Sequence, residues 1–171
     1  MRTVMDNARI LMGDPENYNA RAQVMWAGSL SHNGLTGCGT EGDRACQQLE
    51  HELSAAWEVA HGAGLAAVWG SWARYVYREM PERFAQFAVN VCGVTNRFTD
   101  PERTALEGIR RMEEFFREIG MPVSIGDMGI ALTEEKIREL AHKCSFFGTR
   151  TIGAFKKLDE KDMEEIYRAA R

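Results

Sequence analysis

The sequence predicts an all-α fold, with residues 1–171 forming a single helical bundle, and three observations support this prediction. Apolar residues recur at intervals of three and four over most of the chain, which is the period of an amphipathic helix. Several of these stripes directly follow a helix-start signal, in which Asp or Thr precedes Pro or Glu. No segment alternates apolar and polar residues as a half-buried strand does, and no repeat or low-complexity linker divides the chain.

The first predicted helix begins at Asp14-Pro15, because an aspartate N-cap followed by proline at the first helical position is a typical helix start. The apolar residues that follow at helical spacing are Ala22, Met25, Trp26 and Leu30. Asn33-Gly34 is a typical helix end, so the pattern predicts a helix of about four turns.

Three further helices are predicted in the middle of the chain. The first begins near Asp43, and its apolar face holds Leu49, Leu53 and Ala56. His61 opens the second, which is apolar nearly all round and carries a stripe of Leu65, Val68, Trp69, Trp72 and Val76. The third follows Pro81, and its apolar residues are Phe84, Phe87, Ala88 and Val91. The last two are expected to be the central helices of the bundle.

The remaining predicted helices each begin with an N-cap signal. Asp100-Pro101 opens the clearest one, whose stripe is Ile109, Met112, Phe116 and Ile119. Thr133, with two glutamates in the first turn, opens another, whose apolar face holds Ile137, Leu140, Ala141 and Cys144. Asp159 opens the last, which carries Met163, Ile166 and Ala170.

Composition and charge argue against several classes of protein. The net charge is −4 and no basic run is longer than a pair such as Lys156-Lys157, so a nucleic-acid-binding surface is not expected. No apolar stretch approaches bilayer length, and the amino terminus resembles no targeting signal, so a cytoplasmic protein is expected. The chain contains no CxxC pair, and we expect reduced, buried thiols at Cys38, Cys46, Cys92 and Cys144.

Two short motifs suggest chemistry that their context does not support. Residues 37–42 match GxGxxG, but the segment before them is predicted to end a helix, whereas a dinucleotide-binding turn follows a buried strand. A plain loop between two helices is therefore favoured. His51-Glu52 begins an HExxH pattern, but Ala55 stands where the second metal-binding histidine would be. A zinc-protease helix is therefore excluded.

Residues 43–66 contain the more informative polar pattern. On a helix, Gln47, His51 and Ser54 are spaced i, i+4 and i+7 and form a polar stripe beside the apolar one. His61 precedes two glycines, at positions 62 and 64, that allow close backbone approach. Spacing alone leaves two interpretations of His51 and His61 open, structural histidines or ligands, with the structural one slightly favoured.

Motifs spread over essentially all 171 residues resemble those of one enzyme family. They are Met25-Trp26-Ala27, Asn33-Gly34-Leu35, Glu50-His51-Glu52-Leu53-Ser54-Ala55, His61-Gly62-Ala63-Gly64-Leu65-Ala66, Gly148-Thr149 and Gly153-Ala154-Phe155-Lys156-Lys157-Leu158. On these motifs the sequence resembles the iron-containing alcohol dehydrogenases, in particular the branch of NAD(P)H-dependent butanol dehydrogenases. The resemblance implies an amino-terminal nucleotide-binding half and a carboxyl-terminal helical half, of which this chain supplies only the later part.

The resemblance also implies roles for three residues. The family holds its catalytic metal between the two halves with one Asp and three His, and the Asp and the first His lie upstream of the residues present here. His61 corresponds to the last ligand, whereas Gln47 stands at the position of the other. An amide oxygen binds Fe²⁺ or Zn²⁺ less firmly than imidazole does. His51 corresponds to an extra histidine that is not a ligand and assists proton movement near the substrate.

The functional hypothesis that follows is an alcohol dehydrogenase homologue, truncated at its amino end and inactive as an isolated chain. Its intact relatives are expected to interconvert primary alcohols such as butanol and aldehydes with NAD(P) and a divalent metal, Fe or Zn, and we expect this chain to retain neither cofactor. One alternative is a subunit of a split enzyme that pairs with a separate nucleotide-binding half. Another is a non-catalytic helical module that self-associates, and a homo-oligomer is expected because large exposed apolar patches are unusual in monomers.

Overall fold

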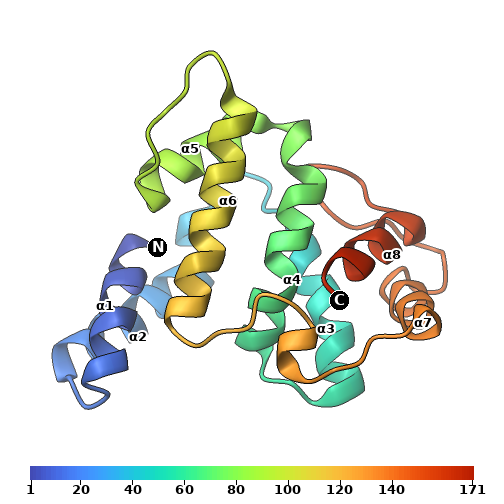
Figure 1. The fold of residues 1–171 in the computed structure, drawn as a ribbon, viewed down its shortest axis with the longest axis horizontal. Coiled ribbons are helices and arrows are strands. Elements are labelled where there is room, and N and C mark those ends of the chain that lie inside the picture. The colour runs from blue at the N-terminus through green and yellow to red at the C-terminus, as the bar shows by residue number, and fades with distance from the viewer.

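A computed structural model describes all residues, 1–171, and confirms the predicted all-α architecture. Eight α-helices are joined by loops and three short 3-10 turns, and the only β-type pairing is an isolated bridge between Ile152 and Leu158. Figure 1 shows the helices in chain order. Their bounds are α1 Arg2–Gly13, α2 Tyr18–His32, α3 Ala45–Trp57, α4 His61–Val76, α5 Pro81–Cys92, α6 Pro101–Glu118, α7 Glu134–Cys144 and α8 Glu160–Ala169.

Helix α4 lies at the centre of the bundle, between α6 and α8 (Figure 1). Its composition explains this central position, because a helix that is apolar on nearly every side has no polar face to expose to water. Val68, Ala73 and Val76 are completely buried within a core cluster of 23 residues. Helix α3 packs against α4 and against α7, and α7 packs against α8. The prediction of two central helices is therefore confirmed for the helix opened by His61, whereas the helix after Pro81, α5, packs mainly on α6.

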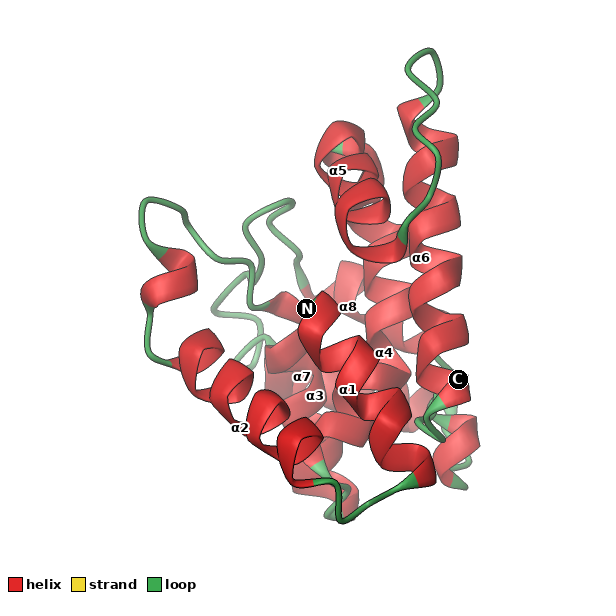
Figure 2. Cartoon of the chain, turned by 90° about the vertical axis from the view of Figure 1, so that its left-hand side faces the viewer, coloured by secondary structure: helices red, strands yellow, loops and turns green.

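Helices α5 and α6 form a close pair, which Figure 2 shows side by side beneath the loop that joins them. The closeness depends on Gly108 of α6, which faces Ala88 of α5. A Cβ atom added at Gly108 would lie only 2.3 Å from the Ala88 Cβ and 2.7 Å from its Cα. The glycine therefore sets the distance between the two helix backbones.

Three of the predicted helix starts are confirmed in their capping geometry. Asp100 accepts a hydrogen bond from the amide of Arg103, and Thr133 accepts one from Lys136. Asp159 and Asp162 form a reciprocal capping box at the start of α8. These side chains satisfy amides that the first helical turn leaves without a backbone partner.

The predicted start at Asp14-Pro15 is wrong by three residues. Those residues form the turn after α1, a helix that the sequence pattern did not predict, and the Asp14 carbonyl accepts from the Asn17 amide at 3.1 Å. The N-cap of α2 is Asn17, whose side chain accepts from the Ala20 amide at 3.0 Å. An Asp-Pro pair also favours a tight turn, and the preceding helix α1 leaves room only for that turn.

Helix α2 packs mainly on α1 and is the most exposed helix of the chain. Of its fifteen residues only Ala20 is buried, whereas Met25 is 71% exposed and Trp26 is 65% exposed. Helix α1 in turn packs through Met5 against Met112 and Phe115 of α6. No helix of the fold is both long and apolar enough to cross a bilayer.

The expectation of four reduced, buried cysteines is only partly correct. All four are free thiols, but Cys38 is exposed because it lies in the loop between α2 and α3. Burial raises the pKa of Cys46 and of Cys144 to about 12, and that of Cys92 to about 11. These three thiols therefore remain protonated near neutral pH.

We predict that Gly108→Ala lowers the free energy of unfolding by about 1–3 kcal/mol, because overpacking forces α5 and α6 apart. Gly28→Ala is the matched control, since Gly28 lies within α2 and a Cβ there meets no atom within 4 Å. That control should be neutral or stabilising by up to about 1 kcal/mol from helix propensity. Urea denaturation followed by circular dichroism measures both, and equal effects would contradict the close packing at Gly108.

We predict that a thiol-specific reagent at about pH 8 modifies one cysteine rapidly and the other three only after unfolding. The rapid one is Cys38, because it alone is exposed. Its replacement by serine should abolish the fast phase, whereas Cys144→Ala should leave it unchanged. Two or more fast thiols in the native protein would contradict the shielding of the buried Cys144 and of the half-buried Cys46 and Cys92.

Candidate functional site

The candidate site lies where helices α3 and α4 meet. Helix α3 ends at Trp57 because Glu58 takes a left-handed conformation, with φ of 53°, and donates its amide to the Ser54 carbonyl at 2.9 Å. After Ala60, in extended conformation, α4 begins with His61. This short connection folds the first residue of α4 back onto the middle of α3. Two polar residues eleven positions apart, Glu50 and His61, are brought into contact in this way.

Glu50 is the one charged side chain at this site that is completely buried. One carboxylate oxygen accepts a hydrogen bond from the Ser54 hydroxyl, and the other is bonded to Nδ1 of His61. A buried charge without partners would cost several kcal/mol, so these two bonds are conditions for the folded state. The His61 side chain is 48% exposed, so the pair joins a buried carboxylate to a ring that reaches the surface.

Glu50 belongs to one of the sequence motifs, but no motif identified it as a site residue. The signal was nevertheless present, because Cys46, Leu49, Glu50 and Leu53 are spaced i, i+3, i+4 and i+7 along one helix face. Leu49, Glu50 and Leu53 are all buried. A charged residue within an otherwise apolar stripe requires a polar partner from another element, which here is His61.

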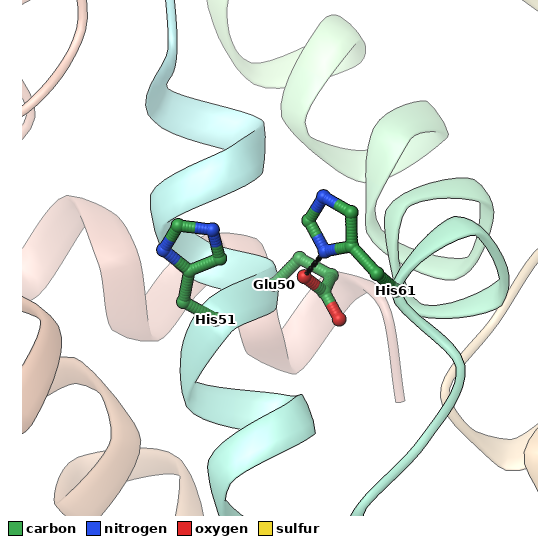
Figure 3. A group of neighbouring side chains, drawn as sticks. All are labelled: Glu50, His51 and His61. Carbon is green, nitrogen blue, oxygen red and sulfur yellow. Dashed lines mark hydrogen bonds and ion pairs between the residues drawn. The ribbon is translucent and has the colours of Figure 1, made fainter.

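His51 stands beside this pair on the exposed side of α3. The rings of His51 and His61 have centroids 5.5 Å apart and are tilted by 36°. One ligand atom each from Glu50, His51 and His61 can be chosen so that all lie within 4.8 Å of one another. Figure 3 shows the two imidazole rings facing one another, with the Glu50 carboxylate bonded to the ring of His61.

The other predicted members of the polar stripe are arranged differently. Gln47 lies one turn before His51 on α3 and is half-buried. Ser54 was expected to share a stripe with His51, but its hydroxyl instead donates to Glu50. Ala56, expected on the apolar face, is exposed. The predicted apolar stripe is therefore buried at Leu49 and Leu53 but not at Ala56, which lies near the end of α3.

The two glycines after His61 have different environments. A Cβ added at Gly64 would lie 2.6 Å from Oε1 of Glu50, so this position must be glycine for the carboxylate to fit. A Cβ added at Gly62 would only touch the terminal methyl of Met121, at 4.0 Å. The expectation of close approach is therefore confirmed for Gly64 and is wrong for Gly62.

The glycine-rich segment 37–42 is part of the loop between α2 and α3. Its first residue ends a 3-10 turn, Leu35–Gly37, that directly follows α2. No strand precedes it, so the prediction of a plain loop between helices is confirmed.

The donor set at the site fits a divalent metal ion. Imidazole nitrogen and carboxylate oxygen are ligands suited to Zn²⁺ and Fe²⁺. One ring nitrogen of His61 is occupied by Glu50, and a half-exposed ring leaves the other available. His51 offers a second imidazole at a ring spacing of 5.5 Å.

Comparison with known proteins shows the family to which the chain belongs. The sequence model described as the Fe-containing alcohol dehydrogenase family, C-terminal, matches residues 1–171. The probable NADH-dependent butanol dehydrogenase 1 of Bacillus subtilis is 34% identical over 99% of this chain, and the NADH-dependent butanol dehydrogenase A of Clostridium acetobutylicum is 31% identical over 98%. The crystal structure of NADH-dependent butanol dehydrogenase A from Thermotoga maritima superposes with a TM-score of 0.90 at 33% identity, over 99% of the chain.

The matched region is only part of each relative. The chain spans 43% of the length of both curated butanol dehydrogenases and 43% of the Thermotoga maritima chain. The resemblance inferred from the sequence motifs is confirmed by the family match over every residue. The chain belongs to the iron-containing alcohol dehydrogenase family, and it corresponds to the carboxyl-terminal part of that family's members.

Proposed function

We propose that this chain is the helical, metal-facing part of an NAD(P)-linked alcohol dehydrogenase that interconverts primary alcohols such as butanol and the corresponding aldehydes. The observation that carries the proposal is the cluster of Glu50, His51 and His61, in which a buried carboxylate is bonded to the half-exposed His61 and a second imidazole stands beside it. The relatives named butanol dehydrogenases support the substrate class. We place the reaction in the cytoplasm, where the four free thiols stay reduced.

The proposed roles follow from the chemistry of each side chain. His61 would hold a divalent ion through its free ring nitrogen, and the amide oxygen of Gln47 would be a second, weaker donor. Such an ion, when bound, supplies the positive charge that polarises an alcohol or aldehyde oxygen, and NAD(P) supplies or accepts the hydride. His51, exposed beside His61, is proposed to move a proton to or from the substrate oxygen.

Residues 1–171 by themselves are proposed to be catalytically inactive. The candidate ligands all come from α3 and α4, and one imidazole with one amide oxygen holds Zn²⁺ or Fe²⁺ weakly. The nicotinamide-binding site is proposed to lie in a separate nucleotide-binding half, covalently attached or on another polypeptide. The two halves together would complete both the metal site and the cofactor site.

An alternative proposal is that the chain acts by association alone. Helix α2 supports it, because Tyr18, Met25 and Trp26 are all more than half exposed on a helix that packs mainly on α1. Such a surface is typical of an interface. The partner on this surface would be either the nucleotide-binding half or a second copy of this chain in a homo-oligomer. Sedimentation of the chain, with and without the nucleotide-binding half, distinguishes these two partners.

We predict that Gln47→His strengthens Zn²⁺ binding by the purified chain at least about tenfold, because imidazole is a firmer ligand than an amide. Gln48→His is the matched control, since it adds the same group about 100° further around α3. Metal content after dialysis against buffered Zn²⁺, measured by elemental analysis, gives both affinities. Equal gains in the two variants would contradict the position assigned to Gln47, and firm binding by the unmodified chain would contradict its proposed weakness.

We predict that the chain alone, supplied with NADH and Fe²⁺ or Zn²⁺, does not reduce butanal. Addition of the nucleotide-binding half of the Bacillus subtilis relative should give NADH oxidation that depends on butanal, more strongly with Gln47→His. His61→Ala in the same pair should abolish the activity. Turnover by the isolated chain would contradict the proposed division of labour, and no activity in any pairing would favour the association-only alternative.

A further inference from the structure

The contact with Glu50 occupies Nδ1 of His61 and leaves Nε2 as its free ring nitrogen. We propose that Glu50 is a positioning residue, whose buried carboxylate keeps the proton on Nδ1 of His61 and so presents Nε2 as the metal-binding atom. This inference rests on the proposed function, since it assigns a role to Glu50 within the same metal site. Glu50 itself touches neither metal nor substrate in this arrangement.

The carboxylate is held from three sides. One oxygen accepts from the Ser54 hydroxyl one turn further along α3, and the other is bonded to His61. The backbone at Gly64 closes the third side, so closely that a Cβ there would overlap the carboxylate at 2.6 Å from Oε1. Because Glu50 is completely buried, water cannot take the place of these partners. The carboxylate is therefore a fixed acceptor rather than a mobile surface group.

A fixed acceptor decides the tautomer of a neutral imidazole. Neutral imidazole carries one N–H, and an ionised carboxylate can only accept, so the hydrogen must lie on Nδ1. Nε2 then carries the lone pair that a metal ion needs. Figure 3 shows the second ring nitrogen of His61 directed away from the carboxylate, and the His61 side chain is 48% exposed.

The same contact increases the attraction of Nε2 for a cation. A carboxylate bonded to the far side of a histidine raises the basicity of the liganding nitrogen and fixes the ring orientation, and removing such a partner typically costs about 10–100-fold in metal affinity. The negative charge of Glu50 would also lie one imidazole ring away from an ion bound at Nε2. Glu50 would thus support His61 at a site where the neighbouring position, Gln47, supplies no charge and no imidazole.

The first test reads the tautomer without any metal. At about pH 8, where an unperturbed histidine is neutral, nitrogen-15 NMR should show His61 as the Nδ1–H form alone. Glu50→Gln should give a mixture of both tautomers, because an amide can donate or accept at Nδ1. Glu52→Gln is the matched control on the same helix and should leave His61 unchanged. Should Glu50→Gln fail to fold, Gly64→Ala, which displaces the carboxylate but keeps its charge, serves instead.

The second test measures metal affinity in the Gln47→His background, by the visible absorption of bound Co²⁺. Glu50→Gln should weaken binding about 10–100-fold, while Glu52→Gln should not. An unchanged tautomer, or an unchanged affinity despite a changed tautomer, would overturn the role of Glu50. If no variant binds Co²⁺ but the tautomer responds as expected, the proposed metal function fails while the control of His61 by Glu50 stands.

Discussion

One buried carboxylate constrains the geometry of the whole candidate site. Glu50 lies on the apolar face of α3, and its charge is tolerated in the core only because His61 and Ser54 provide hydrogen bonds. The requirement fixes how α4 approaches α3 and explains the glycine at position 64. It also explains why His61 is the first residue of its helix, where the ring can reach back to α3 and still be half exposed.

The carboxyl-terminal part of the chain also holds α3 in place. The hydroxyl of Tyr167 in α8 donates to the carbonyl of Leu49 at 2.6 Å, and burial raises the pKa of this tyrosine well above its usual value. Asp43, just before α3, accepts hydrogen bonds from the amides of Ala154 and Phe155. Residues from the carboxyl-terminal end of the chain therefore fix the helix that carries Glu50 and His51, which gives the site the rigid support that ligand positioning needs.

The helices differ in how much of their apolar surface is buried. Helices α3, α4, α7 and α8 share one core, whereas α2 rests mainly on α1 and presents Met25 and Trp26 to solvent. The family match covers residues 1–171 completely, yet these residues are 43% of the length of the curated relatives. The exposed apolar side chains of α2 and the half-exposed His61 are both features that the proposed cofactor-binding half would cover.

The sequence by itself determined the helical class and the family. It also determined six of the eight helices, with starts close to the observed ones. This was possible because periodicity, capping residues and contiguous motifs are local properties. It missed α1, and it misplaced the start of α2, since Asp14-Pro15 suits a turn as well as a helix. Gln47, His51 and His61 could be named from motifs, but their roles could not be derived from spacing. Only the tertiary structure placed the Glu50 carboxylate against His61, because that contact joins two helices through a turn whose path no local pattern specifies.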